Sequence, residues 1–220
     1  MTEAGFLDKS VLLGFCFRTD PHHARCRDYL EGEKDYYITE EIDDAFERNR
    51  KRMTQSHADA IQLHLKDIRD SPHSGPLGTN DLDDIRENVL FDGNEVAEFL
   101  DRWYAQTVDS GITASELEDR LRYLARDIER MAYQRKTDFD ELVILWERED
   151  DYPDVKSVLS EMSAEDMFVC VDAHDVAVHL DVATELATAD ESDFIENGRT
   201  ELILDNTALD AIVGLSVASD

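Results

Sequence analysis

The sequence has few lysines, and its cysteines form no recognisable framework. Lysine occurs six times in 220 residues, and arginine supplies most of the 22 positive charges. The three cysteines, Cys16, Cys26 and Cys170, have neither C-x-x-C spacing nor the spacing of a zinc site. An odd number of cysteines without a framework is typical of reduced, buried thiols in a cytoplasm. A disulfide-stapled scaffold is therefore not expected.

Long apolar runs and several diagnostic motifs are also missing. No run approaches the roughly 18 apolar residues that a membrane-spanning helix needs. The first residues show no basic segment followed by an apolar one, so we expect a cytoplasmic chain that is neither secreted nor membrane-spanning. Because the sequence has no P-loop and no nucleophile elbow, a phosphatase-like or other small-molecule hydrolase is a weaker interpretation.

Acidic residues dominate what is present. The 52 Asp and Glu residues give a formal net charge of −30, and they are spread along the whole chain. With 42% apolar residues this is still a folding sequence and not a disordered tail. An evenly acidic, lysine-poor surface resembles the proteins of salt-loving archaea, because at about 1 M salt the Debye length is about 3 Å and self-repulsion is screened. An ordinary acidic protein is the alternative.

The beginning of the chain predicts alternating strands and helices. We expect a strand over residues 5–7, a buried helix over 10–17 and a second helix from Pro21 to Leu30, with Asp20 as its N-cap. A strand at 36–39 precedes a helix that begins at Glu40. This order is typical of a parallel α/β sheet.

The middle of the chain predicts helices without strands. A long polar helix is expected over residues 41–70, a loop over 71–78 and a helix over 93–108. Thr113-x-x-Glu116 forms a capping box in front of an apolar stripe at helical spacing. The members of this stripe are Leu117, Leu121, Leu124, Ile128 and Met131. The stripe indicates packing, so we expect one domain with a helical insertion at about 53–162.

The α/β pattern returns near residue 163. Ser163-x-x-Asp166 resembles a second capping signal before a helix with Val171, Val176 and Val178. A strand is expected at 185–188, followed by Asp190, and a final edge strand at 211–216.

Several of these segments resemble the PIN-domain nucleases. That family has an Asp after its first strand, then a small polar residue and an apolar helix, as in Phe6-Leu-Asp8-Lys-Ser10. Asp20-Pro-His-His-Ala24 is similar to the opening of the family's next helix. Late in the chain the family shows an Asp that opens a helix and a strand ending in Thr-x-Asp. Here Asp172 and Thr188-Ala-Asp190 resemble them, at the family spacing and with Asp193-Phe194 following. The resemblance covers residues 4–50 and 165–216.

The resemblance implies a three-layer PIN-like fold with a central, mostly parallel sheet and a large helical insertion. It implies that Asp8, Asp172 and Asp190 bind Mg²⁺ or Mn²⁺, with Thr188, Asp193 and Ser10 behind them. Carboxylates at the C-terminal ends of neighbouring parallel strands converge where α/β ligands bind, and crowded carboxylates need a cation. Such a site hydrolyses phosphodiester bonds, so the expected activity is that of a metal-dependent endoribonuclease.

One family acid is missing. The family shows Thr-x-x-Val-x-x-Glu at the helix after the second strand, whereas Thr39-Glu-Glu-Ile-Asp-Asp-Ala45 has alanine at the glutamate position. Asp44 as a catalytic acid or Glu41 as a metal ligand would replace it, or the ligand is absent. A catalytically impaired PIN-like module that binds a protein or RNA is therefore the alternative function.

The densest basic run and the expected partners leave further alternatives open. Arg48, Arg50, Lys51 and Arg52 either contact RNA phosphates or pair with surrounding acids. The family includes toxin ribonucleases with antitoxin partners as well as RNA-processing and RNA-decay nucleases. The expected partners are RNA, an antitoxin-like or other protein, or a second copy in a homodimer.

Overall fold

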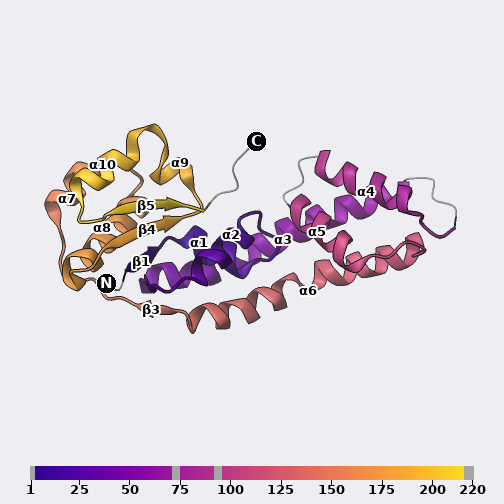
Figure 1. Cartoon of the computed structure of the whole chain (residues 1–220), viewed down its shortest axis with the longest axis horizontal. Helices are drawn as coiled ribbons and strands as arrows, with labels where there is room; N and C mark the ends of the chain where they lie inside the picture. Colours follow the sequence, from indigo (N-terminus) through magenta and orange to yellow (C-terminus); the bar gives the residue numbers. More distant parts are fainter. Residues whose placement is uncertain (1–2, 71–74, 92–95, 216–220) are drawn as a thin grey trace. The chain divides into compact units, whose positions relative to one another are not determined.

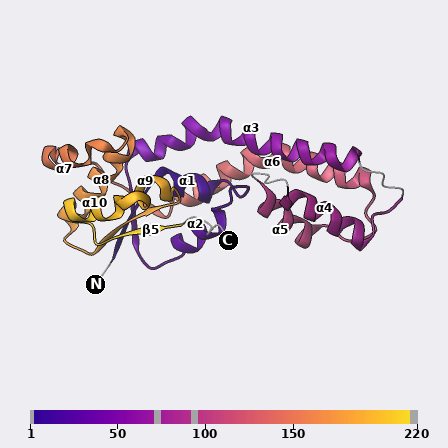
Figure 2. The same ribbon diagram turned by 90° about the horizontal axis from the view of Figure 1, so that it is seen from above.

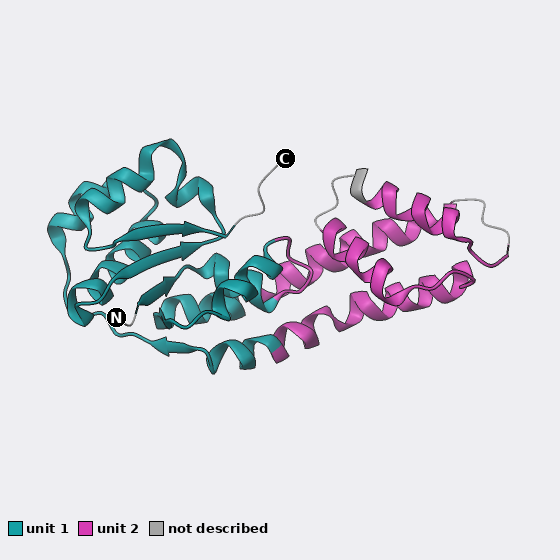
Figure 3. Cartoon of the chain, in the orientation of Figure 1, with its two compact units in different colours: residues 1–16, 22–48, 135–220 teal, residues 17–21, 49–134 magenta. Residues whose placement is uncertain are grey.

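The computed structural model describes residues 3–70, 75–91 and 96–215, and it divides the chain into two compact units (Figures 1 and 3). The first unit contains Met1–Cys16, His22–Arg48 and Arg135–Asp220. The second contains Phe17–Pro21 and Asn49–Gln134.

The first unit contains a five-stranded sheet in which every strand pair of the described residues is parallel. The order is β3-β2-β1-β4-β5. The strands are β1 (Ala4–Leu7), β2 (Asp35–Ile38), β3 (Val143–Leu145), β4 (Thr184–Thr188) and β5 (Ala211–Gly214). The chain therefore builds the sheet outward from β1 in one direction and, after β3, crosses back to add β4 and β5 on the other side of β1.

The central strands are apolar on both faces, as a parallel sheet covered by helices requires. Phe6, Leu7 and Leu186 are fully buried. Gly5 allows Tyr29 of the helix over residues 23–30 to pack closely against β1, because a Cβ there would lie 2.8 Å from the Tyr29 hydroxyl. β1 lies at the centre of the sheet, in register with β4 from Ala4↔Thr184 to Leu7↔Ala187.

Helices connect the strands. Because crossovers between parallel strands are right-handed, the first-unit helices that lead from β1 to β3 and those that lead from β3 to β5 are expected on opposite faces of the sheet. The helices of the first unit are α1 (Lys9–Cys16), α2 (His23–Leu30), the start of α3 (Glu40–Asp70), the end of α6 (Ala114–Asp140), α7 (Pro153–Val158), η1 (Leu159–Glu161), α8 (Ala164–Leu180), α9 (Glu191–Phe194), η2 (Glu196–Gly198) and α10 (Arg199–Asn206).

The second unit is helical in its described residues. It contains the rest of α3 and α6, together with α4 (Thr79–Phe91) and α5 (Ala97–Thr107). Within this unit α3 and α6 run side by side (Figures 1 and 2), joined by ion pairs from Arg50 to Glu129 and from Arg69 to Glu118. The two helices are antiparallel, because the earlier residue of α3 meets the later residue of α6.

The apolar stripe of α6 packs in the core, as predicted. Leu117, Leu121, Leu124 and Ile128 are buried, whereas Met131 is partly exposed. The Thr113 hydroxyl accepts a hydrogen bond from the Glu116 backbone N–H at 3.3 Å, and Oε2 of Glu116 accepts one from the Thr113 N–H at 2.9 Å. The predicted capping box is therefore confirmed.

Some predicted boundaries were wrong. The helix expected from Pro21 begins instead at His23, with His22 at the N-cap, so Asp20 does not cap it. Strand β3 and helix α4 were not predicted. Because β3 pairs with β2, residues 135–162 belong to the α/β unit and not to the helical one, which differs from the expected insertion at 53–162.

Three predictions reach beyond the described residues. Of the expected loop at 71–78, residues 71–74 lie outside them, and Pro76 forms an isolated antiparallel bridge with Thr113. Residues 93–95 of the helix expected at 93–108 lie outside as well, and the helix observed there, α5, spans Ala97–Thr107. Ser216, the last residue of the expected final strand, also lies outside. No helix in the described ranges is both long enough and apolar enough to cross a bilayer.

Candidate active site at the ends of β1 and β4

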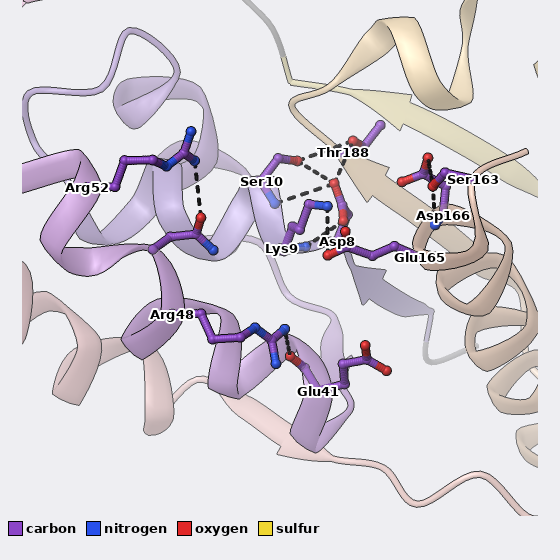
Figure 4. Close-up of polar contacts among 11 residues, drawn as sticks. Asp8, Lys9, Ser10, Glu41, Arg48, Arg52, Ser163, Glu165, Asp166 and Thr188 are labelled. Carbon is purple, nitrogen blue, oxygen red and sulfur yellow. Dashed lines mark hydrogen bonds and ion pairs between the residues drawn. The ribbon is translucent and has the colours of Figure 1, made fainter. Parts of the chain in front are cut away.

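Asp8 follows β1 directly and is 1% exposed. Its Oδ1 accepts a hydrogen bond from the Lys9 backbone N–H at 2.6 Å. Its Oδ2 accepts one from the Ser10 hydroxyl at 2.6 Å and one from the Thr188 hydroxyl at 3.1 Å (Figure 4). Since the donors come from α1 and from the end of β4, the carboxylate is fixed at the junction of the two central strands.

Ser10 and Thr188 also connect Asp8 to the segment after β4. The Ser10 hydroxyl accepts a hydrogen bond from the Ala189 N–H at 2.8 Å. The Thr188 hydroxyl accepts one from the Asp190 N–H at 3.0 Å. Each hydroxyl thus donates to the Asp8 carboxylate and accepts from the backbone that leads into α9, so the position of Asp8 and the path of that backbone depend on each other.

The position between β1 and β4 is chemically significant. The strand order reverses here, because one half of the sheet grows from β1 towards β3 and the other continues through β4 to β5. In open parallel sheets, ligands bind in the crevice at the carboxyl ends of the strands where the order reverses. Asp8 and Thr188 stand at those two carboxyl ends.

The Asp8 carboxyl has a perturbed acidity. Burial raises its pKa above the usual value, while hydrogen bonds from Ser10 and Thr188 and the nearby Lys9 ammonium oppose that rise. Burial disfavours the ionised carboxylate, whereas the hydrogen-bond donors around the carboxylate favour the ionised form. The site therefore holds a carboxylate whose charge is only partly compensated by its own surroundings.

Three further acids gather beside the end of β4. Asp190 precedes α9, and its Oδ1 accepts a hydrogen bond from Ser192 at 2.7 Å. Asp193 lies in α9, where burial and the charges of Asp166 and Asp190 raise its pKa. Asp166 is buried in the first turn of α8. The name acidic cluster is used below for Asp8, Asp166, Asp190 and Asp193.

Asp166, a member of the acidic cluster, also takes part in the cap at the start of α8. The Ser163 hydroxyl donates to Asp166 Oδ2 at 2.6 Å and accepts from the Asp166 N–H at 3.1 Å, so the predicted cap is confirmed. Asp166 also acts electrostatically on Lys9, Cys170 and Asp193, and Asp8 acts on the first two of these. The carboxylates of Asp8 and Asp166 therefore both lie close to Lys9 and Cys170.

Two cations lie at the edge of the acidic cluster: Lys9, and Arg199, whose Nη1 lies 3.4 Å from Oδ1 of Asp193. Lys9 is in the first turn of α1, and its ammonium pairs with Glu165 at 2.8 Å, with side-chain exposures of 30% and 50% (Figure 4). Glu165, Asp8 and Asp166 all raise the pKa of Lys9, although burial alone would lower it. Lys9 is thus a partly exposed cation, held by an exchangeable partner.

A narrow pocket of about 10 Å³ adjoins Lys9, with room for about one water molecule. Its lining residues are Lys9, Thr39, Glu41, Ile42, Arg48, Glu165, Phe168, Val169 and Asp172. Arg48 Nη2 donates to the Glu41 carbonyl at 2.8 Å. The pocket beside the acidic cluster is therefore lined by both basic and acidic side chains.

Asp172 belongs to this pocket and lies in the middle of α8. Burial raises its pKa to about 6; Arg148, whose Nε lies 3.3 Å from Oδ1, opposes the rise, while Glu41 and Asp175 add to it. Asp8 interacts instead with Lys9, Ser10 and Thr188. Because α8 begins at Ala164, Asp172 does not open a helix, and the expectation that it would is wrong. The aspartate at the start of this helix is Asp166.

The remaining predicted site residues are dispersed. Glu41 lines the pocket with Asp172, whereas Asp44 is exposed on α3 and is not among the lining residues. Ala45 is buried.

The basic run is divided between the two units. Arg48 lines the pocket in the first unit. Arg50 of the second unit pairs with Glu129 and lies 4.9 Å from the centre of the Tyr133 ring. Lys51 is exposed, and Arg52 donates to Asn49 at 3.1 Å. Of the two alternatives for the basic run, pairing with a surrounding acid is thus the one observed for Arg50.

Sequence reasoning missed Lys9, Glu165 and Asp166 as members of the site. For Asp166 a signal existed, because Ser163-x-x-Asp166 already predicted a helix start and the resembling family has an Asp at a helix start. Lys9 gives no such signal, since a lysine beside an aspartate in a chain with 52 acids looks like an ordinary surface pair.

The donor set agrees with Mg²⁺ or Mn²⁺ in chemistry, because every candidate ligand is a carboxylate or hydroxyl oxygen. In residues 3–70, 75–91 and 96–215, however, no group of three or more His, Cys, Asp or Glu side chains is arranged to hold a metal ion. Mg²⁺ usually keeps several waters and is often bound through only one or two protein carboxylates.

Comparison with known proteins adds no relative. No family model matches the sequence, and the searches of curated proteins and of solved structures each found no match.

Proposed function

We propose that this chain is a metal-dependent endoribonuclease of the PIN type, which hydrolyses RNA phosphodiester bonds. One observation carries the proposal: the Asp8 carboxylate is buried and held by Ser10 and Thr188 where β1 and β4 end, with Asp166, Asp190 and Asp193 nearby. The same carboxylate accepts backbone N–H groups at the start of α1, yet burial raises its pKa and so opposes its ionisation, which is typical of acids at functional sites.

The roles of the side chains follow from their positions. Asp8, Asp166 and Asp190 would hold Mg²⁺ or Mn²⁺, and Asp193 would support them. A divalent cation bound there supplies an activated water and neutralises charge on the scissile phosphate. Ser10 and Thr188 keep the Asp8 carboxylate from rotating, so its oxygens remain aimed in a fixed direction.

Positive charge for the substrate would come from Lys9 and Arg48. Both line the pocket beside the acidic cluster, and both are exposed at least in part. Lys9 is held by Glu165, an exposed acid that a phosphate group can replace without leaving a buried charge behind. We expect Lys9 to contact an RNA phosphate and Glu165 to compete with that phosphate.

The test is Mn²⁺-dependent cleavage of labelled single-stranded and structured RNA in molar KCl. We expect cleavage by the unaltered chain and its loss in Asp8→Asn. Asp154→Asn, an exposed acid of α7, is the matched control and should cleave normally. Equal cleavage by Asp8→Asn and the unaltered chain would contradict the proposal.

A second candidate function is a PIN-like module with impaired catalysis that binds RNA or a protein. Two observations favour it. Ala45 is buried at the family's glutamate position, and among the described residues no three or more His, Cys, Asp or Glu side chains are arranged to hold a metal ion. RNA binding without cleavage at any Mn²⁺ concentration would favour this second function over the first.

A further inference from the structure

β3, one of the two edge strands of the sheet, and the residue just before it carry an unusual concentration of exposed apolar side chains. Leu142, Ile144 and Leu145 are 44%, 45% and 63% exposed. Of the eight large apolar side chains that are exposed among the described residues, these three fall within four consecutive positions. In a chain with 34% charged residues, such a run on the surface indicates a contact site.

The backbone of β3 is open to a further strand on its outer side. β3 ends the sheet, and in the described part of the chain its strand partner is β2. The Trp146 N–H donates to the Ile38 carbonyl at 2.8 Å, and Ile38 is in register with Leu145. Since alternate residues of a strand direct their backbone groups to the same side, Ile144 and Trp146 face β2, and Val143 and Leu145 face outward.

The segment after β3 is anchored by a buried carboxylate. Asp175 is fully buried in α8, and its carboxylate accepts hydrogen bonds from the Trp146 indole at 2.8 Å and from the Glu149 N–H at 3.0 Å. The outer edge is therefore fixed before any partner arrives, which lowers the entropy lost when a strand adds to it.

The charges beside β3 decide which partner fits. Glu141 and Glu147 are exposed and lie three residues before and after Ile144. A second copy paired antiparallel about Ile144 would place Glu141 opposite Glu147, and like charges directly opposite each other destabilise a strand pair. A strand with Lys or Arg at two positions six residues apart would instead place opposite charges there.

We propose that β3 is a docking edge for an extended peptide segment of another protein, with apolar residues at its centre and a basic residue at each end. The partner strand would take hydrogen bonds from the outward backbone groups of Val143 and Leu145 and cover the exposed apolar side chains. This binding does not depend on nuclease activity, so it would hold for either function considered above.

The test uses the full chain at the lowest KCl concentration at which its circular dichroism spectrum is that of the folded protein. The probes are the labelled peptides Lys-Thr-Val-Thr-Val-Thr-Lys and Glu-Thr-Val-Thr-Val-Thr-Glu, and the measurement is binding by fluorescence anisotropy. We expect the basic peptide to bind at least about fivefold more tightly. Residue-resolved hydrogen exchange should show new protection at Val143 and Leu145.

Two variants separate docking from folding. Leu145→Pro removes an outward N–H and leaves the hydrogen bonds to β2 intact, so it should keep the stability of the chain and weaken the basic peptide about tenfold. The pair Glu141→Lys and Glu147→Lys should reverse the preference between the peptides. Equal binding of both peptides, or binding unaffected by Leu145→Pro, would overturn the proposal. A homodimer that Leu145→Pro dissociates would also overturn it, because the occupant would be a second copy.

Discussion

The hydroxyl oxygens of Ser10 and Thr188 lie 3.2 Å apart, although the two residues are 178 positions apart in the chain. Both hydroxyls contact the same oxygen of Asp8. The geometry of that carboxylate therefore depends on the correct pairing of β1 with β4, and an error in the pairing would disperse the site.

The first prediction concerns these two hydroxyls. Ser10→Ala and Thr188→Ala should each lower kcat for RNA cleavage about 10-fold to 100-fold, because an oriented carboxylate loses one of its donors. Each should cost about 1–3 kcal/mol in unfolding free energy, since a charged acceptor is left less well satisfied. The measurements are single-turnover cleavage and urea unfolding in molar KCl. Thr188→Ser retains the hydroxyl and should recover most of the rate; equal loss in Thr188→Ser would contradict the orienting role.

The second prediction separates two aspartates of α8. Asp166→Asn should lower cleavage at least about 100-fold, because it removes a negative charge from the acidic cluster. Its stability should change little, since asparagine can still accept the Ser163 hydrogen bond. Asp172→Asn should leave cleavage within about threefold, because Asp172 pairs with Arg148 in the adjoining pocket. A larger loss in Asp172→Asn than in Asp166→Asn would restore the original assignment of Asp172 as a ligand.

The third prediction concerns Lys9 and its partner. Lys9→Met should raise KM for RNA and reduce the slope of log affinity against log salt by about 0.7, the value of one phosphate contact on a single strand. Glu165→Gln should have the opposite effect on KM, because it releases Lys9. Lys34→Met, which removes a cation paired with Glu185, is the control and should change neither quantity. The same change in KM for Lys9→Met and Glu165→Gln would exclude competition between Glu165 and phosphate.

The fourth prediction is a dependence of stability on pH. Burial alone would raise the pKa of Asp175, but hydrogen bonds from the Glu149 N–H, the Trp146 indole and the Asp150 N–H lower it below the usual value. The unfolded chain therefore binds this proton more readily, so the stabilisation is present above the ordinary aspartate pKa of about 4 and is lost as pH falls through the lower folded value.

Asp175→Asn removes this stabilisation. At pH 7 it should lower the unfolding free energy by about 1.5–3 kcal/mol, because the charged acceptor of the indole and backbone donors is lost. The difference from the unaltered chain should shrink as the pH is lowered below 4. Urea unfolding followed by tryptophan fluorescence measures both effects. A constant difference from pH 3 to pH 7 would show that Asp175 titrates normally.

The fifth prediction concerns salt. With a net charge of −30, the folded chain repels itself, and the Debye length falls from about 10 Å at 0.1 M salt to about 3 Å at 1 M. The unfolding temperature should therefore rise between 0.1 M and 1 M KCl. Sucrose at matched osmolality should raise it less, since it does not screen charge. A salt-independent unfolding temperature would favour an ordinary acidic protein.

Local patterns predicted elements whose signals are strong. The stripe from Leu117 to Ile128 and its Thr113–Glu116 cap specified α6, because both depend on nearest neighbours along one helix. The α/β class with a parallel sheet also followed from the order of its strands and helices. β3 gave no signal, because a three-residue strand followed by charged residues has no period to detect.

The site was predictable in part. The sequence pointed to Asp8, Ser10 and Thr188, and the structure brings these residues together. The choice between Asp166 and Asp172 could not be made from spacing, because acids occur throughout the chain and the decision depends on where α8 begins. The pairing of Lys9 with Glu165 joins α1 to α8 and depends on tertiary packing, which no local pattern encodes.

α3 and α6 each belong to both units, since α3 passes from one to the other after Arg48 and α6 after Gln134. An excised helical unit would therefore begin and end within helix interiors, and a shortened chain would have to splice two such interiors together. Dissection of this protein is accordingly better pursued with point substitutions than with truncated fragments.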